Sequence, residues 1–64
     1  MVVNGRPHPW RPALTLAALL HELGAEQAGV AIERNACVVR RADHATTTLS
    51  PGDRIEIVRL VGGG

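Results

Sequence analysis

The sequence predicts an α+β roll in which a mixed sheet of four to five strands is covered by one main helix. Three observations support this fold class: an early Asn-Gly turn between short extended segments, one leucine-rich stretch with helical spacing, and a final β-branched run. The chain has 64 residues, which is enough for one small domain. We expect residues 1–61 to form that domain and residues 62–64 to form a flexible glycine tail.

A hairpin is predicted at the beginning of the chain. Val2 and Val3 form its first strand, and Asn4-Gly5 tolerates the positive φ angles of a type I′ turn. The second strand is expected to run from Arg6 to Trp10. Its two prolines cannot donate to a strand ladder, which favours a position at the edge of the sheet.

The main helix is predicted between residues 14 and 23. Thr15 is a candidate N-cap, with Leu14 packing onto Leu19 across it, and Gly24 suits a left-handed C-cap. The apolar stripe at helical spacing, which we expect to cover the sheet, consists of Leu16, Leu19, Leu20 and Leu23.

A second hairpin is predicted after the helix, with strands at residues 30–32 and 38–39 joined by Asn35-Ala36. Residues 40–48 are polar and predict a surface connection, and residues 50–53 (Ser-Pro-Gly-Asp) predict a turn. The last strand then runs from Arg54 to Leu60. We expect it to lie parallel to the first strand, with the helix in the crossover connection.

The last strand predicts two different faces, because side chains alternate along an extended chain. Ile55 and Ile57 are expected to face the helix. Val58 and Leu60 either form an exposed apolar patch with Arg59 at its rim or tuck against the edge of the core, and the sequence favours neither alternative.

Three glycines, Gly62, Gly63 and Gly64, follow this strand. Glycine lets a backbone approach another surface closely, so such a tail can enter a narrow channel and present its terminal carboxylate to a second protein. A frayed end or an expression remnant has the same composition. We interpret Gly64 as the reactive residue, with Gly62 and Gly63 as its tether.

Composition argues against several other functions. The net charge is +1, all seven basic residues are arginine, and Trp10 is the only aromatic residue, a composition that does not suit nucleic-acid binding. The single Cys37 cannot form an internal disulfide, and we expect a reducing, cytoplasmic setting without a membrane span. The histidines and Cys37 fall in different predicted elements, so no metal site is expected. The acidic residues interpreted as solvated or capping groups are Glu22, Glu26 and Asp53.

Four segments together closely resemble the ThiS family, the small sulfur carriers of thiazole assembly in thiamine biosynthesis. They are VVNG at residues 2–5, LTLAALLHELG at 14–24, VAIERN at 30–35 and GDRIEIVRLVGGG at 52–64. The resemblance implies a β-grasp, or ubiquitin-like, fold. The prolines between Arg6 and Trp10 and a third terminal glycine depart from the family's pattern.

The resemblance also implies a mechanism in which the chain is a co-substrate and not an enzyme. A ThiF-like adenylyltransferase, using ATP and a metal ion of its own, would adenylate the carboxylate of Gly64. A persulfide charged by a cysteine desulfurase would then give a thiocarboxylate, which passes to a ThiG-like thiazole synthase. Val58, Leu60 and Arg59 are the residues expected to contact partners. The chain itself is expected to bind no cofactor and to be a monomer when free.

Other functions remain open at this point. The same activated Gly64 could serve molybdopterin synthesis or a specialised pathway, although the related molybdopterin carriers are generally longer and have aromatic core residues. It could also form an amide bond to a target lysine, as a protein modifier does. This chain contains no lysine, which disfavours chains built on copies of itself. A third alternative is an interaction module that binds through Val58 and Leu60 and has an inert tail.

Overall fold

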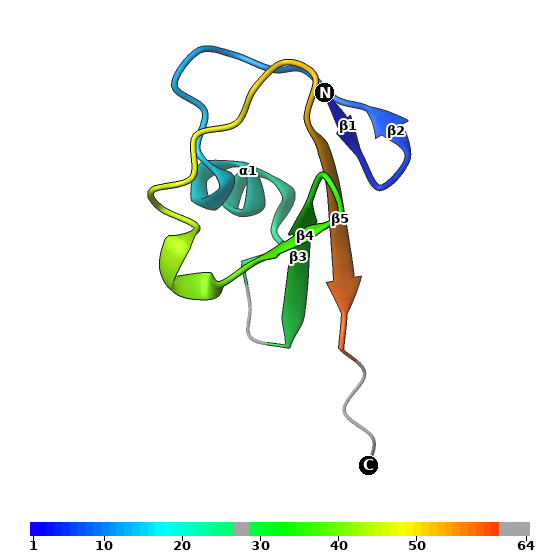
Figure 1. Ribbon diagram of the computed structural model, residues 1–64, viewed down its shortest axis with the longest axis vertical. Helices are drawn as coiled ribbons and strands as arrows, with labels where there is room; N and C mark the ends of the chain where they lie inside the picture. The colour runs from blue at the N-terminus through cyan, green and yellow to red at the C-terminus, as the bar shows by residue number, and fades with distance from the viewer. Residues whose placement is uncertain (27–28, 61–64) are drawn as a thin grey trace.

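The computed structural model describes residues 1–26 and 29–60, and within them it contains one five-stranded sheet and one α-helix (Figure 1). The sheet has the strand order β2-β1-β5-β3-β4. Its elements in chain order are β1 (Val2–Val3), β2 (Arg6–Pro7), α1 (Leu16–Leu23), β3 (Val30–Arg34), β4 (Cys37–Val39), the 3₁₀ helix η1 (Arg41–Asp43) and β5 (Arg54–Arg59).

Strand β5 is the central strand, as the predicted roll requires. It pairs in parallel with β1, where Val3 lies opposite Ile55, and antiparallel with β3, where Ile32 lies opposite Ile57. The parallel pairing of the first and last strands is therefore confirmed. The α+β prediction, a mixed sheet with one main helix, is also confirmed.

Helix α1 begins and ends at the predicted capping residues. The Thr15 hydroxyl accepts a hydrogen bond from the Ala18 backbone N–H at 3.1 Å, which satisfies one of the free donors at the helix start. Gly24 has a φ of 67°, the left-handed conformation that commonly ends a helix. Leu14 and Leu19, on either side of the cap, are both buried.

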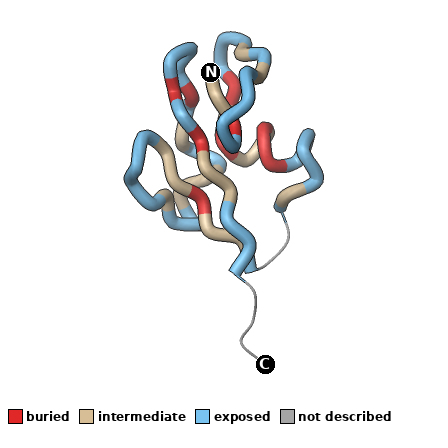
Figure 2. The backbone as a smooth tube through the Cα atoms, turned by 90° about the vertical axis from the view of Figure 1, so that its right-hand side faces the viewer, coloured by how far each residue is buried: buried red, intermediate tan, exposed pale blue. Residues whose placement is uncertain are grey.

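The core lies between α1 and the sheet, where the buried segments gather in Figure 2. The sequence did not identify Leu49 as part of this core, because it follows a polar stretch without periodicity. A bridge between Thr15 and Thr48 holds this stretch against the helix start, and the Leu49 N–H donates to the Leu14 carbonyl at 2.8 Å. The buried apolar residues are Val3, Leu14, Leu16, Leu19, Leu20, Ile32, Leu49 and Ile55.

Strand β2 is shorter than predicted, and residues 8–10 lie outside it. The His8 N–H still donates to the Met1 carbonyl at 2.9 Å, but Pro9 has no N–H with which to continue the ladder. The chain then turns inward, and the Trp10 indole Nε1–H donates to the Leu49 carbonyl at 2.9 Å. The single aromatic residue therefore closes the side of the core instead of extending the sheet.

Asp53 is buried, so its interpretation as a solvated residue was wrong, while its capping role is confirmed. Its carboxylate accepts from the Ser50 backbone N–H at 2.8 Å, from Arg34 Nε at 2.8 Å and from Asn35 Nδ2 at 3.0 Å. Burial opposes ionisation, but the hydrogen bonds from Ser50, Asn35 and Arg34 together outweigh it and lower the pKa of Asp53. This cluster fastens the second hairpin to the start of β5.

The two hairpin turns differ at one residue, and this difference predicts a stabilising substitution. Asn4-Gly5 and Asn35-Ala36 both have positive φ angles, with 78° at Gly5 and 69° at Ala36. A left-handed alanine is strained by roughly 1–2 kcal/mol, because its Cβ approaches the following carbonyl. We expect Ala36→Gly to raise the free energy of unfolding by about 1 kcal/mol. This is the relief of strain less the extra conformational entropy that glycine gives the unfolded chain. Urea denaturation measures this change.

Ala45→Gly is the matched control, because Ala45 is exposed and is not among the residues with positive φ. There the same substitution only adds freedom to the unfolded chain, and we expect a slight destabilisation. If Ala36→Gly also destabilised the protein, the strain argument for this turn would be wrong.

Candidate functional site

The predicted reactive residues, Gly62, Gly63 and Gly64, lie outside the described residues. The structure does show where the chain that carries them begins. The Leu60 N–H donates to the Gly29 carbonyl at 2.7 Å, one residue after β5 ends at Arg59. Four residues follow Leu60, and fully extended they reach at most about 14 Å. Any chemistry at Gly64 must therefore take place close to this end of the sheet.

Val58 and Leu60 are exposed at this end, with 44% and 61% of their surface accessible. The predicted alternation holds, since Ile55 is fully buried and Ile57 packs against the core on the other side of β5. We call Val58 and Leu60 the tail-side patch. The sequence left open whether these two side chains are exposed or packed against the edge of the core. In the structure they are exposed.

The tail-side patch adjoins two carboxylates on the outer side of the sheet. Glu33 and Glu56 lie directly opposite each other on β3 and β5, and Val58 follows Glu56 on the same side of β5. Like charges at directly opposed positions repel each other. This side of the sheet therefore offers a partner an apolar patch with negative charge beside it.

Arg59 differs from its predicted place at the rim of the patch. Strand alternation puts it on the side of Ile57, opposite Val58 and Leu60, and there it lines a cavity of 480 Å³ with residues of α1 and the first hairpin. We call this cavity the helix-side groove. It is lined among others by Arg6, His8, Leu23, Val30, Ile57 and Arg59.

Sequence reasoning missed the helix-side groove, because the groove arises from how three elements meet. The leucine stripe of α1 was expected to be core throughout. Leu16, Leu19 and Leu20 are buried, but Leu23 in the last turn remains 41% exposed. The first hairpin is too short to cover this turn, with two residues in each of its strands. The only indication in the sequence was that Val2 and the proline-rich segment are close together along the chain, which limits the length of the first hairpin.

The described residues contain no group of three or more histidine, cysteine or acidic side chains that could hold a metal ion. Cys37 is exposed on the edge strand β4. Among residues 1–26 and 29–60, no helix is long and apolar enough to span a membrane. Within the described part of the chain, the tail-side patch and the helix-side groove remain as surfaces for recognition by a partner.

Comparison with known proteins gives a consistent result over the whole chain. The model of the ThiS family matches residues 1–64. The crystal structure of the thiamine biosynthesis protein ThiS from Geobacter metallireducens superposes with a TM-score of 0.82 at 36% sequence identity, covering 98% of this chain and 96% of that one. The β-grasp fold expected from the resemblance is thereby confirmed.

Two similar proteins are much longer than this chain. A thiazole synthase of Paramagnetospirillum magneticum is 39% identical over 64 residues, which are 100% of this chain and 20% of that protein. A thiazole synthase of Magnetococcus marinus is 42% identical over 62 residues, covering 97% of this chain and 19% of that protein. The chain thus spans about a fifth of the length of these relatives.

Proposed function

The chain belongs to the ThiS family, and from this membership we propose that it is a sulfur carrier of thiamine biosynthesis whose Gly64 is converted to a thiocarboxylate. The observation that carries the proposal is the family match, which extends through the glycine end at residue 64. The fold agrees with it, because the central strand β5 leads directly toward that end. In this function the chain is a co-substrate of other enzymes.

The proposed chemistry converts the carboxylate of Gly64 to a thiocarboxylate in three steps. The carboxylate of Gly64 attacks the α-phosphorus of ATP on a ThiF-like adenylyltransferase, and pyrophosphate leaves. A persulfide, charged by a cysteine desulfurase, then attacks the acyl carbon and AMP leaves. A second thiol then attacks the donor's sulfur in the acyl disulfide, forms a disulfide with it, and releases Gly64 as the thiocarboxylate. Activation is necessary because a carboxylate is a poor electrophile, and ATP and its metal ion belong to the activating enzyme.

A thiazole synthase is the proposed acceptor of the sulfur. The names of the two longer relatives support this choice, since each is a thiazole synthase that includes a region similar to this chain. In this proposal Gly62 and Gly63 form a tether that enters the acceptor's channel. The tail-side patch contacts the partner at the base of the tether.

Mass spectrometry of the intact chain tests this function. The chain is incubated with the adenylyltransferase, ATP and a persulfide donor, and we expect a product heavier by the difference between sulfur and oxygen. The reaction without ATP is the control and should leave the mass unchanged. Conjugates of higher mass with amide linkage would instead indicate a protein modifier, and an unchanged mass in the complete reaction would contradict the proposal.

The tail-side patch gives a separate prediction. We expect Leu60→Asp to raise the KM of the activating enzyme for this chain roughly tenfold, because the carboxylate would have to be desolvated in the interface. Steady-state ATP–pyrophosphate exchange measures this effect. Val38→Asp is the matched control, since Val38 is an exposed valine on the same side of the sheet, opposite Glu33 on the edge strand β4 and two strands away from β5. An equal effect of both substitutions would show that the patch has no special role.

A further inference from the structure

The helix-side groove has an apolar floor and a basic rim. Leu23, Val30 and Ile57 supply apolar surface, while Arg6, His8 and Arg59 supply the polar groups. A volume of 480 Å³ falls within the range of ligand-binding sites, and the groove is partly open to solvent. Its composition therefore suits an occupant that is apolar in the middle and anionic at its ends.

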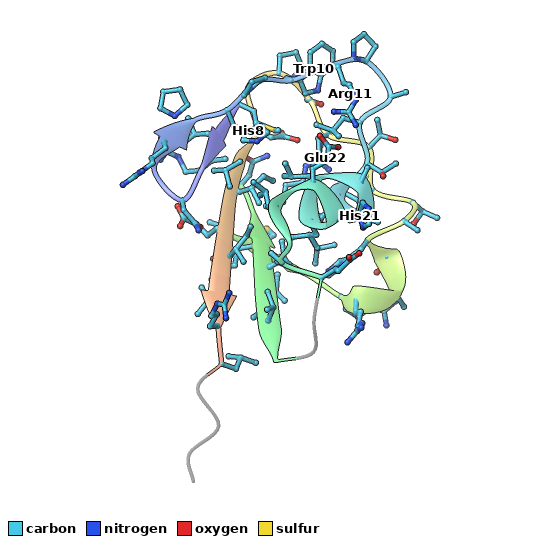
Figure 3. All side chains as sticks on the ribbon, turned by 180° about the vertical axis from the view of Figure 1, so that it is seen from behind. His8, Trp10, Arg11, His21 and Glu22 are labelled. Carbon is cyan, nitrogen blue, oxygen red and sulfur yellow. The ribbon has the colours of Figure 1, made fainter. Side chains whose placement is uncertain are left out.

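The basic side chains of the groove are available to such an occupant. Arg6 and Arg59 form no ion pair with any residue in the described parts of the chain, unlike Arg11, Arg34 and Arg40. Among residues 1–26 and 29–60, no carboxylate lines the groove. Glu22 is near His8, but it accepts two hydrogen bonds from Arg11, at 2.6 and 3.0 Å. Both side chains are labelled in Figure 3. The unbalanced charge of the groove is positive.

The described residues leave the apolar floor partly exposed. Leu23 belongs to the same helical stripe as the buried Leu16, Leu19 and Leu20, yet 41% of its surface remains accessible. An apolar side chain placed over Leu23 and Ile57 would remove this surface from water, a favourable change of roughly 25 cal/mol per Å². The two arginines at the rim would at the same time orient carboxylates beside it.

The position of the groove connects it with the tail. Arg59 ends β5 and directly precedes Leu60, which is hydrogen-bonded to Gly29. An occupant of the groove would therefore sit beside the base of the tail, on the side of the sheet opposite the tail-side patch. The two surfaces differ in charge, because Glu33 and Glu56 border the patch side.

We propose that the helix-side groove is a docking site for a segment of a partner protein that carries an apolar side chain flanked by carboxylates. This inference rests on the proposed function, because the partner is the enzyme that activates the tail. The groove and the patch would then hold the base of the tail from both sides of the sheet. Complementary charge at the rim accelerates encounter and fixes the orientation of the domain.

Charge reversal at the rim tests this docking site. We expect Arg6→Glu and Arg59→Glu each to raise the KM of the activating enzyme for this chain about tenfold, with kcat unchanged. The effect should shrink as salt is added, because exposed charges are screened. Arg41→Glu is the matched control, since Arg41 is exposed in η1 and does not line the groove. Its KM should remain within about twofold of the original value.

The outcomes separate this inference from the proposed function. If the unmodified chain is activated but the Arg6 and Arg59 variants have the original KM, the docking site is wrong and the function stands. Equal KM increases in all three variants would mean that the net charge of the chain, and not the groove, causes the effect. This result would also overturn the inference. The unfolding temperature of each variant distinguishes a folding defect from a docking defect. We expect this temperature to be unchanged, because the substituted sites are exposed.

A direct binding measurement covers the case in which no activation is seen. The ¹⁵N-labelled chain is titrated with a capped peptide of alternating glutamate and leucine, and we expect saturable shifts at the amides of Val30, Ile57 and Arg59. A peptide with lysine in place of glutamate is the control and should give no such shifts. Absence of shifts with the glutamate peptide, or equal shifts with both peptides, would contradict the docking site independently of any enzyme.

Discussion

Deleting Gly63 and Gly64 is expected to lower the rate of thiocarboxylate formation at least ~100-fold, because the terminal carboxylate would stop about 7 Å short of the activating enzyme's reaction centre. The deletion removes none of the contacts among the described residues, so the unfolding temperature should not change. ATP–pyrophosphate exchange and intact-mass analysis measure the two steps separately. Deletion of Gly64 alone should give a smaller loss, since the shortened chain still ends in two glycines.

Val61→Gly is the control for this deletion, because it changes the tail's sequence but keeps its length and its terminal glycines. We expect its charging rate to stay within about twofold of the original, as the substitution only adds backbone freedom. A truncated chain that accepted sulfur as fast as the complete one would show that the position of the terminus does not matter. Gly64 would then lose its proposed role.

Asp53→Ala is expected to lower the free energy of unfolding by about 2–3 kcal/mol, because it leaves the partly buried Arg34 without its carboxylate. It also removes the acceptor for Asn35 Nδ2 and for the Ser50 backbone N–H. A core of this size rarely supplies more than ~3–5 kcal/mol. Circular dichroism should therefore show a large unfolded fraction near room temperature.

Asp43→Ala provides the comparison with an exposed ion pair. Asp43 accepts from Arg40 Nε at 3.2 Å, and both side chains are exposed, so we expect a change of less than about 0.5 kcal/mol. Equal destabilisation by the two substitutions would mean that burial of Asp53, with only 6% of its side chain accessible, adds nothing.

The lowered pKa of Asp53 also predicts how stability depends on pH. A carboxylate whose pKa is lower in the folded than in the unfolded chain stabilises the fold above the unfolded value, which is about 3.9 for aspartate. This contribution is lost as the pH falls below that value and through the folded pKa. Asp53→Asn should be less stable at neutral pH and should lose this part of the acid dependence, which urea denaturation across this pH range measures.

Local signals in the sequence predicted most of the fold. The Asn4-Gly5 turn, the Thr15 and Gly24 caps and the helix indicated by the leucine spacing each depend on neighbouring residues, and the structure confirms them, although Leu23 stays partly exposed. The failures involve distant contacts. Leu49 and Asp53 are buried because segments far apart in the chain meet there, and no spacing within either segment indicates this.

In the candidate site, too, local patterns predicted some features, whereas features that depend on distant contacts were missed. Alternation along β5 was enough to predict that Val58 and Leu60 point away from Ile55 and Ile57. The helix-side groove could not be predicted, because it depends on where α1 ends relative to a hairpin with very short strands. Arg59 faces this groove by the same alternation that turns its neighbours Val58 and Leu60 to the opposite side.

The central position of β5 has a mechanical consequence for the proposed function, in which the end of the chain is drawn into an enzyme. A pull applied at Leu60 runs along β5 and loads its hydrogen bonds to β1 and β3 in shear, because strands flank it on both sides. Bonds loaded in this way must yield together, whereas an edge strand peels away one bond at a time. In the proposed function, an enzyme can therefore pull on the last residues of this domain without unfolding it.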